Sequence, residues 1–140
     1  MTTYSPLLTD FYQLTMAYGY WKLQMHEREA TFHLLFRKNP FRGNYALSCG
    51  LGKVIEFLEG WRFHEDDLAY LATLTNSHQE RVFPNEFLDY LSKLKFSCHI
   101  DAVPEGTIIF PHAPVMRIQG PLLQCQLIES SLLNLSLIHI

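Results

Sequence analysis

The order of apolar and polar positions near the start of the chain predicts a helix with two apolar faces. Thr9 and Asp10 are good N-cap residues, so a helix is predicted from Asp10 to Lys22. One face, at the spacing i, i+3, i+4, i+7, carries Phe11, Leu14, Thr15 and Tyr18. The other face carries Tyr12, Met16 and Tyr20. Both faces are therefore expected to be covered, and one of them could meet another subunit.

Alternating apolar and polar residues then predict a half-buried strand from Glu29 to Arg37. Pro40 is expected to end this strand, because proline has no amide hydrogen to donate to a sheet. After a turn at Gly43-Asn44, a second apolar strand is predicted over Tyr45–Cys49. We expect these two strands to be neighbours.

Three short helices are predicted in the middle of the chain. The first runs from Leu51 to a C-terminal glycine, Gly60. The second begins at Glu65, within a run of three acidic residues that suits a helix N-terminus, and its leucine stripe ends at Leu74. The third begins with Pro84, a residue favoured in the first helical turn.

The last third of the chain predicts strands and then one more helix. Short β-type runs at residues 96–103, 107–110 and 115–118 are separated by proline-rich turns, which indicates a compact antiparallel unit. Gly120-Pro121 closes this unit, and a helix is predicted from Leu122 to about Leu135. The predicted fold class is α+β.

Composition narrows the class of protein. A chain of 140 residues that is 48% apolar can bury the core of one domain. Its net charge of -3 argues against a nucleic-acid partner, and no segment approaches the ~20 apolar residues that span a bilayer. Cys49, Cys98 and Cys125 lack the spacing of a disulfide framework or a zinc site. We expect a cytosolic protein with no membrane partner and with buried cysteine thiols.

Five strings, in order, resemble nicotinate phosphoribosyltransferases. The longest runs from Leu7 to Trp21 and includes Thr9-Asp10-Phe11-Tyr12. The others are Phe36 to Phe41, Tyr45-Ala46-Leu47 with Gly50-Leu51, Val103 to Thr107, and Gly120-Pro121-Leu122 with Glu129 and Leu132-Leu133-Asn134. The resemblance covers nearly the whole chain and is weakest between about Glu65 and Phe96.

The resemblance implies the α/β sandwich-like N-terminal domain of a type II (nicotinate/quinolinate) phosphoribosyltransferase, without the catalytic α/β barrel. The implied reaction joins nicotinate to phosphoribosyl pyrophosphate, with Mg and ATP hydrolysis, in NAD biosynthesis. It also implies a cytoplasmic homodimer with the active site between subunits. ATP and Mg would be bound mainly by the barrel, so the isolated chain is expected to be inactive.

Three site residues follow from the resemblance. Tyr12 matches a tyrosine that stacks on the pyridine ring of the substrate in the neighbouring subunit. Arg37 matches a basic residue that reaches phosphate across the same interface, and Lys38 adds charge beside it. By residue type alone, Tyr12 could be a core residue and Arg37 a solvated strand end.

Two further residues, Asp10 and His33, are candidates for the site. Asp10 is interpreted as a helix N-cap rather than as a magnesium partner. His33 shares a strand face with Arg37 and could line the pocket, or could be a solvated histidine. Neither His33 nor His112 has a second ligand at metal-binding spacing, so no metal site and no catalytic residue are predicted in this chain.

Other classes of protein remain as alternatives. Nicotinamide and quinolinate phosphoribosyltransferases share the implied architecture, and a non-catalytic binding or interaction domain is a third possibility. A biotinyl or lipoyl carrier module is disfavoured, because no lysine lies between Asp101 and Gly120 to hold the cofactor.

The domain assignment has two parts. Residues 1–134 are assigned to the N-terminal domain and to the start of its connection to the barrel. Residues 135–140 are expected to be a non-native tail, because Leu135-Ser136-Leu137-Ile138-His139-Ile140 matches a translated sequencing adapter.

Overall fold

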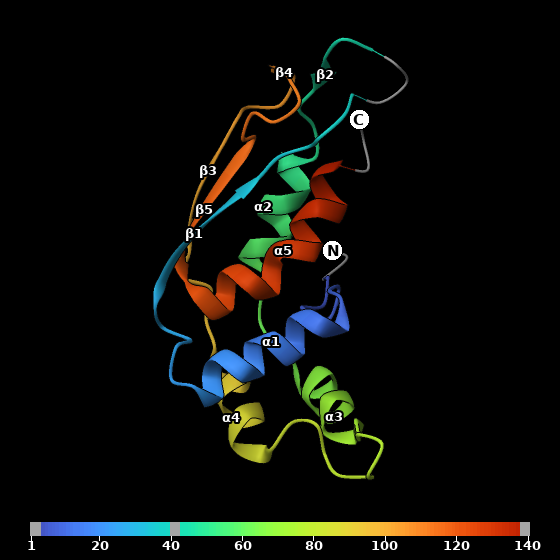
Figure 1. Cartoon of the computed structure of the whole chain (residues 1–140), viewed down its shortest axis with the longest axis vertical. Helices are drawn as coiled ribbons and strands as arrows, with labels where there is room; N and C mark the ends of the chain where they lie inside the picture. The colour runs from blue at the N-terminus through green and yellow to red at the C-terminus, as the bar shows by residue number, and fades with distance from the viewer. Residues whose placement is uncertain (1–3, 40–42, 138–140) are drawn as a thin grey trace.

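A computed structural model describes residues 4–39 and 43–137 of the chain. It confirms the α+β class. The C-terminal helix α5 (Leu122–Leu137) packs between a three-stranded sheet on one side and helix α1 (Phe11–Lys22) on the other (Figure 1). Pro40, the predicted end of the first strand, and residues 138–140 of the expected tail lie outside the described residues.

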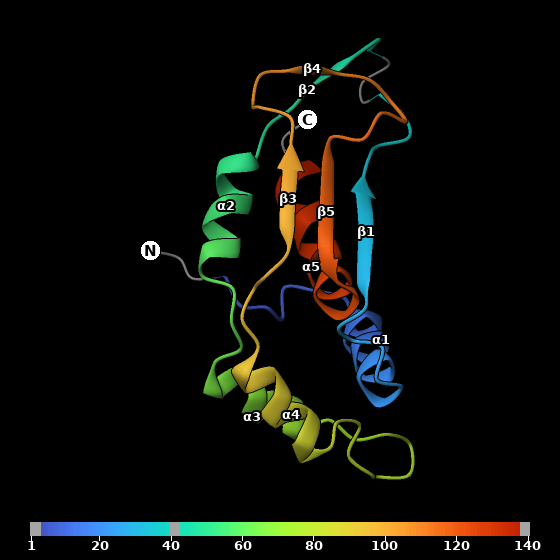
Figure 2. The ribbon, with the colours of Figure 1, turned by 90° about the vertical axis from the view of Figure 1, so that its left-hand side faces the viewer.

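The main sheet is antiparallel, with strand order β1-β5-β3 (Figure 2). Its strands are β1 (Glu29–Leu34), β5 (Met116–Pro121) and β3 (His99–Ala102). In the register, Phe32 and Ile100 lie on either side of Ile118. These three side chains face α5 and the core, whereas the alternate positions face away from it.

The prediction that the first two strands are neighbours is wrong. Strand β1 pairs with β5, and the short strand β2 (Ala46–Leu47) pairs instead with β4 (Ile108–Ile109). The chain beyond β1 bonds to the loop after β4, since the backbone N–H of His112 donates to the carbonyl of Phe36 over 2.8 Å. The predicted antiparallel unit is confirmed only for β3 with β5, because β4 leaves that sheet.

Helix α1 is confirmed, but the predicted buried face is only partly correct. Its buried residues are Gln13, Leu14 and Ala17. Phe11, Tyr12 and Met16 are exposed by 53%, 50% and 38%. This chain covers only one of the two faces, so an apolar strip along α1 faces outward. Coverage of that strip by another subunit stays a prediction.

The three middle helices are confirmed as α2 (Leu51–Glu59), α3 (Glu65–Thr73) and α4 (Asn85–Lys93). Pro84 is the N-cap of α4 rather than its first helical residue. Helix α4 packs beneath α1 through a ring cluster in which Phe87 contacts Tyr18 and Trp21 at centroid distances of 5.2 and 5.5 Å. These rings fix the position of α1 relative to the rest of the domain.

Helix α5 is buried on almost every side, which the sequence pattern did not predict. Its apolar residues Leu123, Leu127 and Leu132 are buried. Gln124 and Gln126 are also buried, at 3% and 5% exposure. The reason is that α1, α2 and the sheet all pack around this helix. Each buried glutamine therefore needs hydrogen-bond partners within the protein.

Candidate functional site

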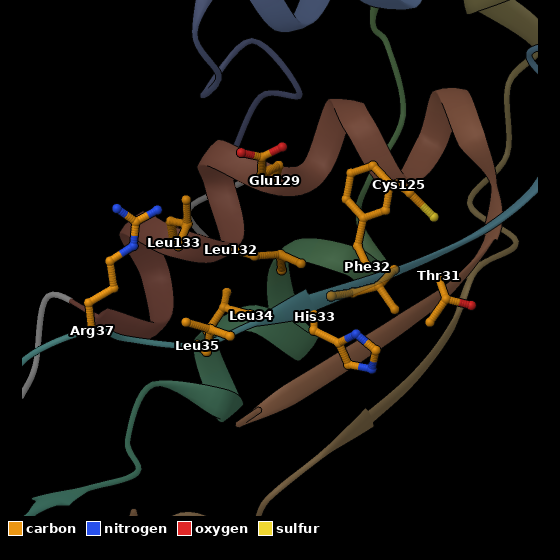
Figure 3. Close-up of a pocket in the computed structure, with 11 residues that line it drawn as sticks. Thr31, Phe32, His33, Leu34, Leu35, Arg37, Cys125, Glu129, Leu132 and Leu133 are labelled. Carbon is orange, nitrogen blue, oxygen red and sulfur yellow. The ribbon is translucent and has the colours of Figure 1, made fainter. Parts of the chain in front are cut away.

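A cavity of about 520 Å³ lies between β1 and α5 (Figure 3). Its walls are mostly apolar, and they include Phe32, Leu34, Leu132 and Leu133. Two charged side chains, Arg37 and Glu129, also line it. A largely apolar hollow with a few charged groups is the usual form of a small-molecule site.

Arg37 lies beyond the end of β1, where its side chain is exposed and lines the cavity together with Leu133 (Figure 3). It forms no ion pair with any residue that the structure describes. Its guanidinium group is therefore available for an anion that arrives from outside the chain. The adjacent Lys38 is exposed too, but it does not line this cavity.

Tyr12 lies at the start of α1 with an exposed ring and an anchored hydroxyl group. The buried Gln13 donates from Nε2 to the Tyr12 hydroxyl over 2.8 Å, and to Ser130 Oγ of α5 over 3.5 Å. Ser130 in turn donates to Asp10 Oδ2 over 2.7 Å. The phenol is thus held from inside the domain while the ring faces outward.

A second buried glutamine extends this network toward the cavity. Gln126 donates from Nε2 to Gln13 Oε1, and also to Glu129 Oε2 over 3.2 Å. Because Glu129 lines the cavity, the network joins the Tyr12 hydroxyl to the cavity wall. The structure therefore gathers Tyr12 and Arg37 around the C-terminal half of α5, the first through Ser130 and the second beside Leu133.

The surroundings of Tyr12 disfavour ionisation of its phenol. Partial removal from water raises the pKa of Tyr12 above its ordinary value, and the negative charges of Glu129 and Asp10 raise the pKa further. A tyrosine phenol is uncharged at neutral pH at its ordinary pKa, and the raised pKa keeps Tyr12 uncharged to a higher pH. An uncharged aromatic face suits stacking on a flat heteroaromatic ring.

The remaining candidates have mixed outcomes. Asp10 holds the N-cap position of α1, but its side chain makes no capping hydrogen bond and accepts from Ser130 instead. His33 is an exposed residue of β1 that contributes to the cavity lining. No role was predicted for Gln13, Gln126 or Ser130, because a periodic pattern does not distinguish a buried polar residue from an exposed one.

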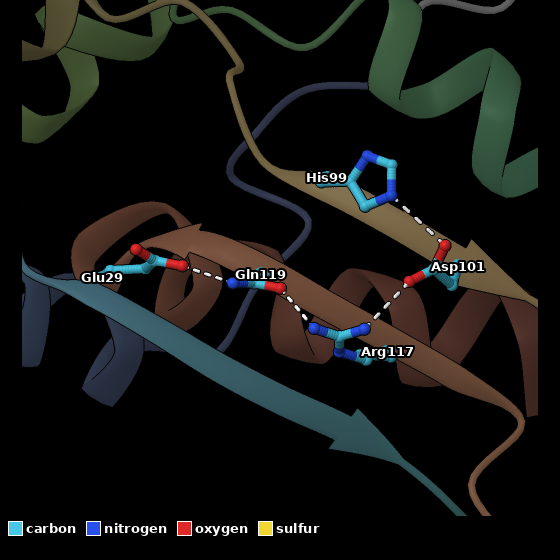
Figure 4. A network of polar contacts seen from close by, with 5 residues as sticks. All are labelled: Glu29, His99, Asp101, Arg117 and Gln119. Atoms are coloured by element: carbon cyan, nitrogen blue, oxygen red, sulfur yellow. Dashed lines mark hydrogen bonds and ion pairs between the residues drawn. The ribbon is translucent and has the colours of Figure 1, made fainter.

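The open face of the main sheet carries a separate polar network (Figure 4). Arg117 lies 3.4 Å from Asp101, which also pairs with His99 at 3.2 Å. Arg117 further donates to Gln119, which donates to Glu29. Since the Arg117 cation is paired with an exposed carboxylate, this face is a weaker candidate for binding an anion than Arg37.

The described residues form neither a cluster of metal ligands nor a membrane-spanning helix. Within residues 4–39 and 43–137, no group of three or more His, Cys, Asp or Glu side chains could hold a metal ion. No helix in the described part of the chain is both long and apolar enough to cross a bilayer.

Comparison with known proteins places these features in a family. Residues 7–136 match the model of the nicotinate phosphoribosyltransferase (NAPRTase) N-terminal domain. A nicotinate phosphoribosyltransferase of Caenorhabditis elegans is 45% identical over 131 residues, which make up 93% of this chain and 23% of that protein. A Bacillus subtilis protein of the same name is 41% identical over 129 residues.

A solved structure agrees with the sequence matches. The crystal structure of human nicotinic acid phosphoribosyltransferase superposes with a TM-score of 0.81 at 38% identity. The match covers 92% of this chain and 25% of the human chain. The chain therefore spans about a quarter of the length of the relatives that it matches.

Proposed function

This chain belongs to the nicotinate phosphoribosyltransferase family, whose N-terminal domain it matches, and we propose that it forms the substrate-capping part of such an enzyme. In the proposed reaction, nicotinate and phosphoribosyl pyrophosphate give nicotinate mononucleotide and pyrophosphate, coupled to ATP hydrolysis, in the cytoplasmic synthesis of NAD. The domain would bind and orient both substrates, and the rest of the enzyme would carry out the chemistry.

The observation that carries the proposal is the exposed but anchored ring of Tyr12. The ring is 50% exposed, while Gln13 fixes its hydroxyl group from the buried side. A ring that is oriented before the ligand arrives loses little conformational entropy on binding. Such a ring can stack on the pyridine of nicotinate, and stacking of this kind is worth about 1 kcal/mol beyond burial.

Arg37 supports a role in binding phosphate. Its planar guanidinium group can donate two parallel hydrogen bonds to phosphate oxygens. It lines the cavity and has no ion pair with a described residue. We assign Arg37 to phosphoribosyl pyrophosphate and give Lys38, outside the cavity lining, a supporting electrostatic role.

The proposed enzyme is a homodimer in which this domain closes the neighbouring subunit's site. The outward apolar strip of α1, which includes Phe11, Tyr12 and Met16, supports this arrangement. An exposed row of large apolar side chains around a site is typical of a surface that meets another protein.

Magnesium and ATP are assigned to the remainder of the enzyme. The described residues contain no cluster of three metal-ligating side chains, and no step proposed for this domain passes through the metal. In this proposal the chain supplies binding groups, and the remainder of the enzyme supplies the metal site. We propose that it is inactive alone.

Nicotinate is favoured over the alternative substrates. The matched relatives of Caenorhabditis elegans and Bacillus subtilis carry the name nicotinate phosphoribosyltransferase, and the identity extends over more than nine tenths of this chain. Nicotinamide and quinolinate are the competing pyridines. A charged ring carboxylate distinguishes nicotinate from nicotinamide, and quinolinate carries a second carboxylate.

A chimera tests this proposal. In this chimera, residues 7–136 of the chain replace the matching segment of the Bacillus subtilis relative. The two segments are 41% identical. The chimera should form nicotinate mononucleotide from nicotinate and phosphoribosyl pyrophosphate, whereas the 140-residue chain alone should form none. A folded chimera that uses nicotinamide or quinolinate in preference to nicotinate would overturn the assignment.

A further inference from the structure

Two cysteine thiols that are distant in sequence meet on the inner face of the main sheet. Cys98 lies immediately before β3, and Cys125 lies in the first turn of α5. Their Sγ atoms are 3.9 Å apart. The sequence predicted buried cysteine thiols but no contact between them. The contact arises because the tertiary fold brings β3 and α5 together.

The glycine between them makes this contact possible. Gly120 of β5 lies opposite Cys98 when the β3–β5 register is continued by one pair. A Cβ atom at Gly120 would lie 2.8 Å from Cys98 Sγ and 2.9 Å from Cys98 Cα. The missing side chain thus leaves the space in which the Cys98 thiol reaches α5.

Cys125 is oriented by backbone carbonyl groups on the other side. Its Sγ lies 3.7 Å from the carbonyl oxygen of Gly120 and 3.9 Å from that of Ala30. The hydrogen bond between the two thiols lowers the pKa of Cys125 and raises the pKa of Cys98. Cys125 is thus the better nucleophile of the two, because the thiolate is the reactive form.

Each thiol can be reached from a different direction. Cys125 is buried in the helix packing but lines the cavity that also contains Phe32 and Glu129. Cys98 is only partly buried. A small oxidant that enters the cavity therefore meets Cys125 first, with Cys98 in contact behind it.

We propose that Cys98 and Cys125 form an oxidation site, at which a peroxide converts the two thiols into one reversible disulfide. The Cys125 thiolate attacks one oxygen of hydrogen peroxide, which leaves a sulfenic acid on Cys125 and releases hydroxide. The Cys98 sulfur then attacks the Cys125 sulfur, loses its proton and expels the sulfenic oxygen as water. The two thiols lose two electrons and two protons in total, and the peroxide becomes two molecules of water.

The change in geometry is small. A disulfide bond is about 2.05 Å long, so the sulfurs must approach by about 1.9 Å, which is within the range of side-chain rotation and a slight shift of α5. The bond would join the start of β3 to the start of α5. Glu129 lies one helical turn beyond Cys125, so the bond would form beside the cavity wall. This proposal does not depend on the catalytic role proposed above.

Mass spectrometry of the 140-residue chain tests the proposal directly. The folded chain is treated with hydrogen peroxide, its remaining thiols are alkylated in denaturant, and the disulfide-linked peptides are mapped. The expected product joins Cys98 to Cys125, with Cys49 alkylated. A thiol reductant should restore three alkylated cysteines. Native products that join Cys49 to another cysteine, or native chains with three free thiols after oxidation, would overturn the proposal.

The chain offers matched controls for this experiment. Cys49 adjoins Gly50, and Gly50 lies against Leu135 of α5. Leu135 is ten residues beyond Cys125 in this helix, so the two residues are about 15 Å apart. Cys49→Ser should leave the disulfide yield unchanged, whereas Cys98→Ser should abolish the disulfide and leave Cys125 as a sulfenic acid that a dimedone probe can trap. Oxidation in urea should give mixed pairs that include Cys49. Equal yields of the Cys98–Cys125 pair in native buffer and in urea would show that the fold does not direct it.

Discussion

The buried amide of Gln13 holds the hydroxyl group of Tyr12, with 2.8 Å between Gln13 Nε2 and the phenolic oxygen. Gln13 is fully buried, whereas Tyr12 is half exposed. The domain therefore orients a surface ring from within its core. This arrangement explains how an aromatic side chain on a helix surface can have a fixed orientation before a ligand binds.

Substitution of Gln13 by leucine should destabilise the domain. Gln13→Leu removes the acceptor for Gln126 and the donor to Tyr12, and an unsatisfied buried polar group costs about 1–3 kcal/mol. We expect a loss of that size in the free energy of unfolding, measured in urea. Thr15→Val on the same helix removes only an exposed bond to a backbone carbonyl, so it should change the value by less than about 0.5 kcal/mol. Equal effects of the two substitutions would contradict a structural role for the network.

Gly120 should not tolerate alanine. The added Cβ would lie 2.9 Å from Cys98 Cα, which can move only with its backbone, so Gly120→Ala should cost about 1–3 kcal/mol of stability. Gly19 in α1 is the matched control, because its Cβ would meet nothing within 4 Å. Gly19→Ala should stabilise the helix by about 0.5–1 kcal/mol. Thermal unfolding of both variants measures the contrast, and a neutral Gly120→Ala would show that β3 and β5 are less closely packed there.

Substitution of Arg37 should weaken the binding of phosphoribosyl pyrophosphate more than the binding of nicotinate. In the chimera, Arg37→Ala should raise KM for phosphoribosyl pyrophosphate about tenfold or more, because a charge-assisted hydrogen bond contributes about 1.5–3 kcal/mol. The KM of Arg37→Lys for phosphoribosyl pyrophosphate should lie between the values of the parent chimera and of Arg37→Ala, because lysine keeps the charge but lacks the planar fork. Arg62→Ala, at an exposed arginine between α2 and α3, should leave KM unchanged. A selective rise in KM for nicotinate would contradict the assignment of Arg37 to phosphate.

Local sequence patterns predicted where helices and strands occur better than they predicted which strands pair. The helices near Leu51, Glu65 and Leu122 follow from apolar spacing and terminal residues, and they occur where expected. The pairing of β1 with β5 did not follow, since a strand's alternation shows which face is buried but not which strand lies beside it. Long-range pairing depends on how the whole chain packs.

The candidate site was likewise predicted only in part. Tyr12 and Arg37 were identified through a family resemblance, and their roles stay predictions. The glutamine pair Gln13 and Gln126 was missed, because burial of an amide depends on partners that are more than a hundred residues away in sequence. The meeting of Cys98 with Cys125 was missed for the same reason.

The nicotinate affinity of Tyr12 variants tests the central claim most directly. In the chimera, Tyr12→Ala should raise KM for nicotinate about fivefold or more, because ring stacking and the burial that goes with it are lost. The KM for phosphoribosyl pyrophosphate should stay unchanged. Tyr12→Phe keeps the ring and loses only the bond from Gln13, so its KM for nicotinate should stay within about threefold of the parent value. An unchanged KM for nicotinate in Tyr12→Ala would contradict the claim that this domain caps the pyridine ring.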